Sequence, residues 1–193
     1  MTPEYYKNYV QSLSRSLSAA EATTADGTRL QQEQALDQWI ELTKRTHGIG
    51  GSIFFVGNGA SAMMASHMAS DSCKTAGLRT MAFNDAALLT AVSNDIAYEE
   101  SFAFPLRVFG KPGDILITIS SSGGSKNILA AIRAAREKTL TVITLSGMRA
   151  DNPSRTSGDL NFYIPATSYG HVESAHQALL HCWLDRYVEV TTS

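Results

Sequence analysis

The sequence is poor in cysteine, in long apolar runs and in net charge, and each shortage argues against a class of protein. Two cysteines, Cys73 and Cys182, among 193 residues are too few for a disulfide scaffold. No apolar run approaches the roughly 18 residues that a membrane-spanning helix needs. A net charge of -2 provides no basic stripe for nucleic acid. The segment 1–7 lacks the basic and apolar order of a secretory signal, so we expect a cytoplasmic protein that binds neither membrane nor nucleic acid directly.

The remaining composition, 44% hydrophobic and 18% charged, is that of an ordinary globular protein. A chain of 193 residues is long enough for one well-buried domain and short for two. We therefore expect residues 1–193 to form a single domain, with a pair of helices over 1–47 and an α/β core over 50–190.

Five short apolar runs, most of them rich in β-branched or aromatic residues, predict strands. They lie at 52–56, 80–83, 115–119, 142–145 and 160–164. Helical segments alternate with these strands, at 60–74, 86–109 (interrupted), 125–138 and 172–190. Such alternation predicts a doubly wound α/β fold, with a five-stranded, mainly parallel sheet and helices on both faces. Two helices, at 3–21 and 29–47, precede the first strand and are separated by a polar break at 21–28.

Two loops that follow strands carry the residues expected of a ligand site. Ligands of open parallel sheets bind beyond the carboxyl ends of the strands, which here lead into loops 57–61 and 120–125. The second loop reads Ser-Ser-Ser-Gly-Gly-Ser and combines four hydroxyls, two glycines and a helix start, which suits a phosphate group. The alternative is that Ser125 only caps the next helix, which leaves the other three serines unexplained.

Two helices carry a second group of candidate residues. His67 and Asp71 are four residues apart, and Glu173 and His181 share one face of the last helix. Two imidazoles and two carboxylates suit a zinc ion. The same four groups can instead act as acids and bases without a metal, and ordinary surface pairs have the same spacing. The spacing alone leaves these three interpretations open.

At these residues the sequence resembles the sugar isomerase (SIS) domain family, and within it the phosphoheptose isomerases, which interconvert sedoheptulose 7-phosphate and a heptose 7-phosphate. The resemblance covers about residues 50–190. It is carried by several blocks in the same order: Gly57–Ala62 followed by His67, Leu89–Glu100, Pro112–Ser120 with the serine loop, and Glu173 through His181. It implies an aldose–ketose isomerase that acts on a phosphorylated sugar through an enediol, in a homotetramer with active sites between subunits.

The resemblance also implies roles for individual residues. The positions implied to bind the substrate and its phosphate are Asn58, Ser61, Asp95, Ser120, Ser121, Ser122 and Ser125. One Zn²⁺ per chain is implied, with His67, Asp71, Glu173 and His181 as ligands. The catalytic groups implied are Asp71, Glu173 and His181.

The sequence departs from the family at two of these positions, with Asp71 in place of a glutamate and Glu173 in place of a glutamine. A family arginine after the first block is replaced by Lys74-Thr75. Three interpretations follow: a heptose phosphate isomerase, an isomerase of another phosphosugar, or a non-catalytic SIS module that binds a sugar phosphate or associates with the replication initiator. The presence of both histidines and two carboxylates favours an enzyme.

Overall fold

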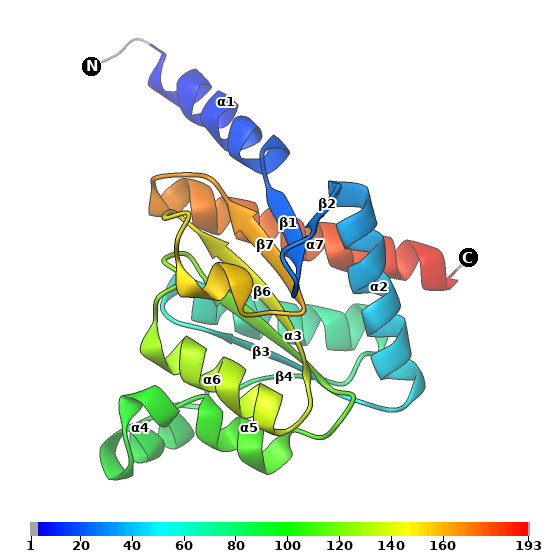
Figure 1. Cartoon of the computed structure of the whole chain (residues 1–193), viewed down its shortest axis with the longest axis vertical. Helices are drawn as coiled ribbons and strands as arrows, with labels where there is room; N and C mark the ends of the chain where they lie inside the picture. Colours follow the sequence, from blue (N-terminus) through cyan, green and yellow to red (C-terminus); the bar gives the residue numbers. More distant parts are fainter. Residues whose placement is uncertain (1–3, 193) are drawn as a thin grey trace.

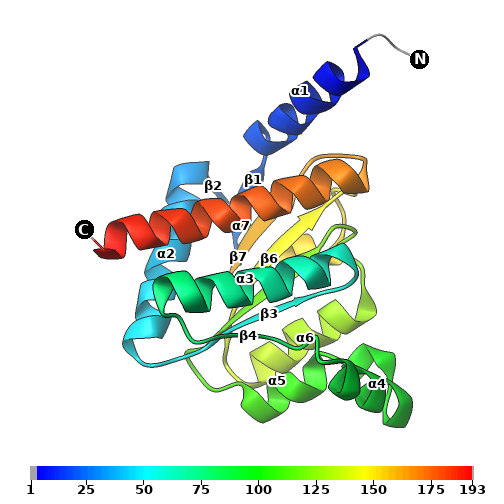
Figure 2. The same cartoon turned by 180° about the vertical axis from the view of Figure 1, so that it is seen from behind.

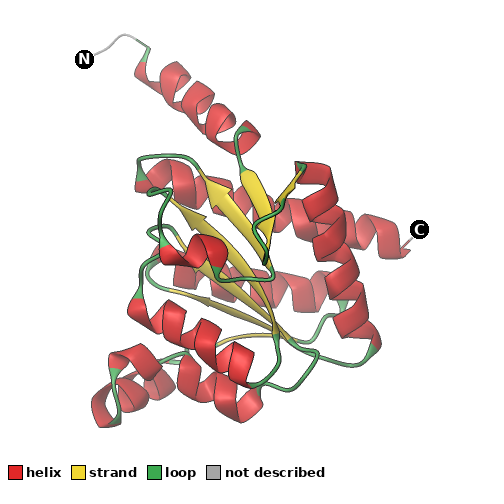
Figure 3. Cartoon of the chain, in the orientation of Figure 1, coloured by secondary structure: helices red, strands yellow, loops and turns green. Residues whose placement is uncertain are grey.

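The computed structural model describes residues 4–192, in which helices and strands alternate over most of the chain (Figure 3). The strands are β1 (Glu21–Thr24), β2 (Arg29–Leu30), β3 (Ile53–Gly57), β4 (Thr80–Ala82), β5 (Ile115–Ser120), β6 (Thr141–Gly147) and β7 (Leu160–Ile164). The helices are α1 (Tyr5–Ser18), α2 (Gln32–Gly48), α3 (Ala60–Ala76), α4 (Ala86–Asp95), α5 (Ala103–Phe109), α6 (Lys126–Glu137) and α7 (Tyr169–Thr192), with 3-10 turns η1 (Tyr98–Glu100) and η2 (Pro153–Thr156). The first predicted helix was expected to start at residue 3, which lies outside the described residues. Within residues 4–192, no helix combines the length and apolar content needed to cross a membrane.

The five predicted strands all form, and they pair in parallel in the spatial order β7-β6-β5-β3-β4. Their register aligns the carboxyl ends: Gly57 pairs with Ile119, and Ser120 pairs with Ser146. The predicted doubly wound α/β fold is confirmed. The polar loops that follow β3 and β5 therefore leave the sheet at the same edge.

Successive side chains along each buried strand enter opposite layers of the molecule. On one face, Ile53 and Phe55 of β3 belong to a core shared with α2, α3 and α7. On the other face, Phe54 and Val56 belong to a core shared with α5 and α6. Figures 1 and 2 show the two layers from opposite sides.

Helix α2 is part of the core, whereas α1 stands away from the body of the molecule (Figures 1 and 2). Trp39 of α2 stacks on Trp183 of α7, with ring centroids 5.1 Å apart. No residue of α1 is buried, although Leu13 and Leu17 pack against a small cluster at the start of α7. The two helices predicted to form an N-terminal pair thus have different roles in the fold.

Residues 21–30 form a β-hairpin. The sequence had predicted a polar break at 21–28 and the start of a helix at 29. Strand β1 pairs antiparallel with β7, and β2 pairs antiparallel with β1, so the sheet has seven strands rather than the five predicted. Helix α2 begins at Gln32 rather than at residue 29, and Gln31 and Gln34 form a capping box at its start.

An Asp-Gly turn explains the hairpin. Gly27 has φ +84°, a conformation that a residue without Cβ adopts readily. The Asp26 carboxylate accepts hydrogen bonds from the Thr24 hydroxyl and the Thr28 amide, and these bonds lower the pKa of Asp26 to about 2. Asp-Gly is a known hairpin signal, but this hairpin becomes a stable structure here because β7 offers it a partner strand.

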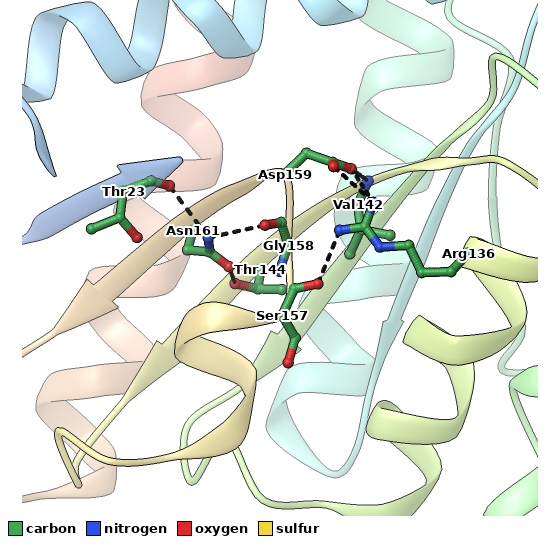
Figure 4. Close-up of polar contacts among 8 residues, drawn as sticks. All are labelled: Thr23, Arg136, Val142, Thr144, Ser157, Gly158, Asp159 and Asn161. Atoms are coloured by element: carbon green, nitrogen blue, oxygen red, sulfur yellow. Dashed lines mark hydrogen bonds and ion pairs between the residues drawn. The ribbon is translucent and has the colours of Figure 1, made fainter. Parts of the chain in front are cut away.

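Asn161 of β7 is the buried residue that joins the hairpin to the parallel strands (Figure 4). Its Nδ2 donates to the carbonyl of Thr23 in β1 at 3.3 Å and to the carbonyl of Gly158 at 3.1 Å. Its Oδ1 accepts from the Gly158 amide at 2.7 Å and from the Thr144 hydroxyl in β6 at 2.8 Å. With 1% of its surface exposed, this side chain has all its hydrogen bonds within the protein.

We expect Asn161→Ala to lower the free energy of unfolding by roughly 2 to 4 kcal/mol, because it leaves several buried polar groups without a partner. Thr144→Val is the matched control, since it removes one of the four bonds and should cost about 1 kcal/mol. Urea unfolding of both variants measures the difference. A loss below 0.5 kcal/mol (about the noise of a surface substitution) for Asn161→Ala would show that the network does not stabilise the fold.

Candidate active site

A pocket of about 150 Å³ opens at the carboxyl edge of the sheet. It lies between the loop after β3, the loop after β5 and the start of α7. Its lining consists of Asn58, Ser61, Ile119, Ser120, Ser121, Ser122, Ser125, Tyr169 and Glu173. The structure therefore brings together the serine loop, Asn58, Ser61 and Glu173, all of which were predicted site residues.

The shape of the serine loop is fixed by a contact with η2. Gly123 has φ +63°, and a Cβ on it would lie 1.9 Å from Oδ1 of Asn152, so no other residue fits at that position. The carbonyl of Gly123 accepts a hydrogen bond from the Ser154 amide at 3.0 Å. The loop is thus anchored on one side, and its serines line the pocket on the other.

The serine hydroxyls are available to a ligand. Ser125 occupies the N-cap position of α6, but its side chain makes no capping hydrogen bond, which argues against the interpretation that it serves only as a cap. The buried Ser121 hydroxyl has no hydrogen-bond partner among the described residues. A buried hydroxyl without a partner and an uncapped helix start in the same loop favour an anion.

The Gly-Asn-Gly loop after β3 forms the opposite wall. A Cβ on Gly57 would lie 2.6 Å from the carbonyl oxygen of Ser61, so a glycine is needed for α3 to turn back this closely. Gly59 precedes α3 with φ +57°. This tight turn places the buried Ser61 side chain, 5% exposed, in the pocket lining.

Asn58 is held by residues that the sequence did not single out. Its amide and that of Asn127 donate to each other, both at 2.9 Å, and the Tyr98 hydroxyl also donates to Asn58 Oδ1 at 2.9 Å. Asn127 is 2% exposed and further donates to the Ser101 hydroxyl at 3.3 Å. Both bonds to Asn58 Oδ1 come from the protein, so the remaining N–H of Asn58 is the group left to donate to a ligand. A clue was present in the sequence, because Asn127 has the helical spacing of Ala130, Ala131 and Ala134 and therefore lies on the apolar side of the helix that follows the serine loop.

A second group of residues meets where α3 and α7 lie side by side (Figure 2). The ligand atoms of His67, Asp71 and His181 all lie within 4.8 Å of one another. The two histidine Nε2 atoms are 3.3 Å apart. Two nitrogens bound at about 2.0–2.1 Å to one tetrahedral zinc ion would be about 3.3–3.4 Å apart, so the donor set and its spacing fit such an ion. Asp71 also lies 3.7 Å from Nζ of Lys74.

Glu173 lies apart from that group. Among residues 4–192, the cluster with metal-binding geometry around His67 does not include it, and Glu173 lines the serine pocket instead. Two helical turns, about 12 Å of rise, separate it from His181 on α7. The four residues predicted as one ligand set are therefore found as a group of three plus a carboxylate in the pocket.

Asp95, a predicted substrate residue, is not part of the pocket lining. It ends α4 and is exposed, and its Oδ1 accepts a hydrogen bond from Nδ2 of the neighbouring Asn94 at 2.8 Å.

His176 holds the pocket end of α7 against the sheet. Its Nε2 lies 3.0 Å from the carbonyl oxygen of Ser146 at the end of β6 and therefore carries the donated proton. Complete burial lowers the pKa of His176 to about 4, so the ring is neutral at physiological pH. This bond fixes the position of α7, and with it Glu173, relative to β6. Strand β6 in turn pairs with β5, the strand that leads into the serine loop.

Comparison with known proteins identifies the family and several relatives of this chain. The SIS domain family model matches residues 8–147. The phosphoheptose isomerase of Thiobacillus denitrificans is 34% identical over 158 residues, which are 78% of this chain and 80% of the relative. That of Helicobacter pylori is 32% identical over 159 residues, covering 79% of this chain and 82% of the relative.

Solved structures extend the likeness to nearly the whole chain. The phosphoheptose isomerase of Neisseria gonorrhoeae superposes with a TM-score of 0.82 at 26% identity, covering 97% of this chain and 99% of that protein. The phosphoheptose isomerase of Francisella tularensis, at 24% identity and a TM-score of 0.83, shares the fold over 98% of both chains.

Proposed function

The chain belongs to the SIS domain family, and from this premise we propose that it is a phosphosugar isomerase, which interconverts an aldose phosphate and a ketose phosphate. The observation that carries the proposal is the serine-lined pocket with Glu173 in its wall. Such a pocket can hold a phosphate at one end and present a proton-transfer group to the carbon chain.

The relatives named above support a particular substrate. Those compared are named phosphoheptose isomerases, so we propose a seven-carbon substrate of the sedoheptulose 7-phosphate type. The whole chain, residues 1–193, then acts as a single SIS domain.

The phosphate group of the substrate would be bound by hydrogen-bond donors. Hydroxyls of Ser120, Ser121, Ser122 and Ser125 would donate to the phosphate oxygens, together with amides at the start of α6. The free N–H of Asn58 and the Ser61 hydroxyl would orient the adjacent part of the sugar. These groups would hold the reacting carbons in place relative to α7, which lowers the entropic part of the barrier.

The proton transfer needs one base and one acid. We assign the base to Glu173, because it lines the pocket, whereas Asp71 lies among the histidines beside Lys74. The carboxylate would remove the proton from the carbon next to the carbonyl. His181 would serve the sugar oxygens in one of two ways: without an ion, as the acid that protonates the carbonyl oxygen to give an enediol, or, with zinc bound, as a ligand of that ion. Return of that proton to the neighbouring carbon, with loss of the other hydroxyl proton, completes the isomerisation.

His67, Asp71 and His181 would hold one zinc ion per chain. Their donor types and the 3.3 Å separation of the imidazole nitrogens fit tetrahedral zinc. A bound zinc ion supplies Lewis acidity, which stabilises negative charge on an enediolate oxygen.

The exposed face of α1 supports assembly. Tyr5 and Tyr6 are 72% and 80% exposed, and none of the residues of this amphipathic helix is buried. Large apolar side chains on a projecting helix are typical of a contact between subunits. We propose that α1 packs against other copies of the chain in a homotetramer.

We expect the purified protein to bind about one zinc ion per chain, and His67→Ala to weaken zinc binding by at least 100-fold because it removes one of three ligands. Competition with a chromogenic chelator measures the affinity. His47→Ala, which removes an exposed histidine of α2, should leave it unchanged. Equal zinc affinity in both variants would rule out this site.

For catalysis, we expect Glu173→Gln to lower kcat for sedoheptulose 7-phosphate by about 100-fold or more with little change in KM, because the amide cannot accept the proton. Exchange of the substrate's carbon-bound proton in deuterated water should fall in parallel. Asp71→Asn should instead lower zinc content.

An active Glu173→Gln variant would overturn the assignment of the base. Absence of both turnover and exchange in the wild-type, zinc-loaded protein would overturn the seven-carbon substrate, and absence of exchange with all phosphosugars tried would favour a non-catalytic binding module.

For assembly, we expect light scattering of the full chain to give the mass of four subunits. Tyr6→Glu combined with Val10→Glu should lower this mass, because it places charge on the exposed apolar side of α1. Ser14→Glu, also exposed on α1, is the control and should leave the mass unchanged. A monomeric wild-type protein would contradict the proposal.

A further inference from the structure

The proposed phosphate pocket has no cation in its lining. Of its nine residues, Glu173 is the one with a charge, and that charge is negative. A phosphate dianion at this position would be repelled by the carboxylate. The start of α6 contributes about half a positive charge, which does not balance the two negative charges of the ligand.

Lys126 is placed to supply the missing charge. It is the first residue of α6 and directly follows Ser125, which lines the pocket. Its side chain is 80% exposed, and its Nζ lies 3.1 Å from Oε1 of Glu99 in η1. The ammonium group is thus held by one exposed carboxylate beside the loop that would bind the phosphate.

Three hydrogen bonds hold the chain neighbours of this ion pair against the wall of the pocket. Asn127, the neighbour of Lys126, pairs with the pocket residue Asn58. Tyr98, the neighbour of Glu99, donates to the same Asn58. Both members of the ion pair therefore adjoin residues that are bonded to one side chain in the pocket wall.

The other cations in loops beyond the sheet's carboxyl edge are more firmly held. Arg149 donates twice to Asp151, at 2.9 and 2.7 Å. Arg155 donates to Glu21 at 2.7 Å and lies over the Tyr163 ring, 4.0 Å from its centroid. Lys126 has a single partner at 3.1 Å, and exposed lysine pairs of this kind contribute little stability, so Lys126 can exchange its partner most readily.

We propose that Lys126 leaves Glu99 when substrate binds and pairs with the substrate's phosphate, so that Glu99 and the phosphate compete for the same ammonium group. The inference rests on the proposed role of the serine loop in phosphate binding. It makes Lys126 a specificity residue for phosphorylated over unphosphorylated sugars, and Glu99 a residue that weakens phosphate binding.

Competition and a structural role predict different results. If the ion pair only stabilised the rim, loss of either partner would have the same effect on binding. If Glu99 competes with the phosphate for Lys126, loss of the Lys126 ammonium weakens phosphate binding and loss of the Glu99 carboxylate strengthens it. Once the ammonium is absent, loss of the carboxylate has no further effect on phosphate binding.

The test uses inorganic phosphate as the probe, measured by isothermal titration calorimetry on the full chain. We expect Lys126→Met to weaken phosphate binding by about tenfold, because it removes a charge-assisted bond while keeping most of the side-chain length. Glu99→Gln should tighten binding by about threefold, in keeping with an exposed pair. The double variant should behave like Lys126→Met. Lys138→Met, at the other end of α6, is the control and should match the wild type.

The same variants give a second measurement with the sugar phosphate. KM should move in the directions given for phosphate, with kcat unchanged. Wild-type phosphate binding that is unaffected by Lys126→Met, or weakened equally by both single variants, would overturn the role of Lys126 while leaving the serine loop as the phosphate site. Wild-type protein that binds no phosphate would overturn the serine-loop assignment and this inference together.

Discussion

A buried parallel strand must find hydrogen-bond partners for its backbone along both edges, because no water reaches it there. Strands β3, β5 and β6 meet this requirement with a register that brings their carboxyl ends level. Every polar feature of the candidate site depends on that alignment. The loops after β3 and β5 supply opposite walls of one pocket, although 62 residues separate Asn58 from Ser120 in the chain. A slip of the register would separate them.

Buried polar side chains then fix how the surrounding segments meet the sheet. Asn161 ties the hairpin to β6, His176 ties α7 to the end of β6, and Asn127 ties α6 to Asn58. Each is at most 2% exposed. Such groups add modest net stability when they are paired, but they are costly when unpaired, so they favour one arrangement of loops over alternatives that would bury the same apolar area. Asn127 bonds directly to a residue of the pocket lining, and His176 lies about one turn along α7 from another, Glu173.

The charge distribution of the pocket is unusual for the phosphate site that we propose. Glu173 places a negative charge in the pocket, at a position where the resemblance implied a neutral glutamine, and the pocket lining has no lysine or arginine to oppose it. The serine hydroxyls and helix α6 can compensate in part through oriented dipoles. In the proposed phosphate site, the remaining negative charge has to be balanced by groups outside the lining, and Lys126 at the start of α6 is such a group.

Several features were determined by the sequence alone. Short apolar runs predicted all five parallel strands. Four of the runs are near-continuous, because a strand buried on both faces needs apolar residues at most positions, and the corresponding strands β3, β5, β6 and β7 are buried along nearly their whole length, whereas β4 is only partly buried. The serine loop was evident for a similar reason: its hydroxyls, glycines and helix start are contiguous in the chain. The i, i+4 spacing of His67 and Asp71 also predicted their proximity, since a helix fixes that relationship locally.

Contacts between distant segments were decided by the tertiary structure. The hairpin at 21–30 forms because β7, well over a hundred residues later, offers its edge. Glu173 and His181 share a helix face as predicted, yet what lies opposite each differs: the serine loop faces Glu173, and α3 brings His67 to His181. Local spacing specifies which side chains point the same way. Which partner each one meets depends on how the layers pack, and that information is spread over the whole chain.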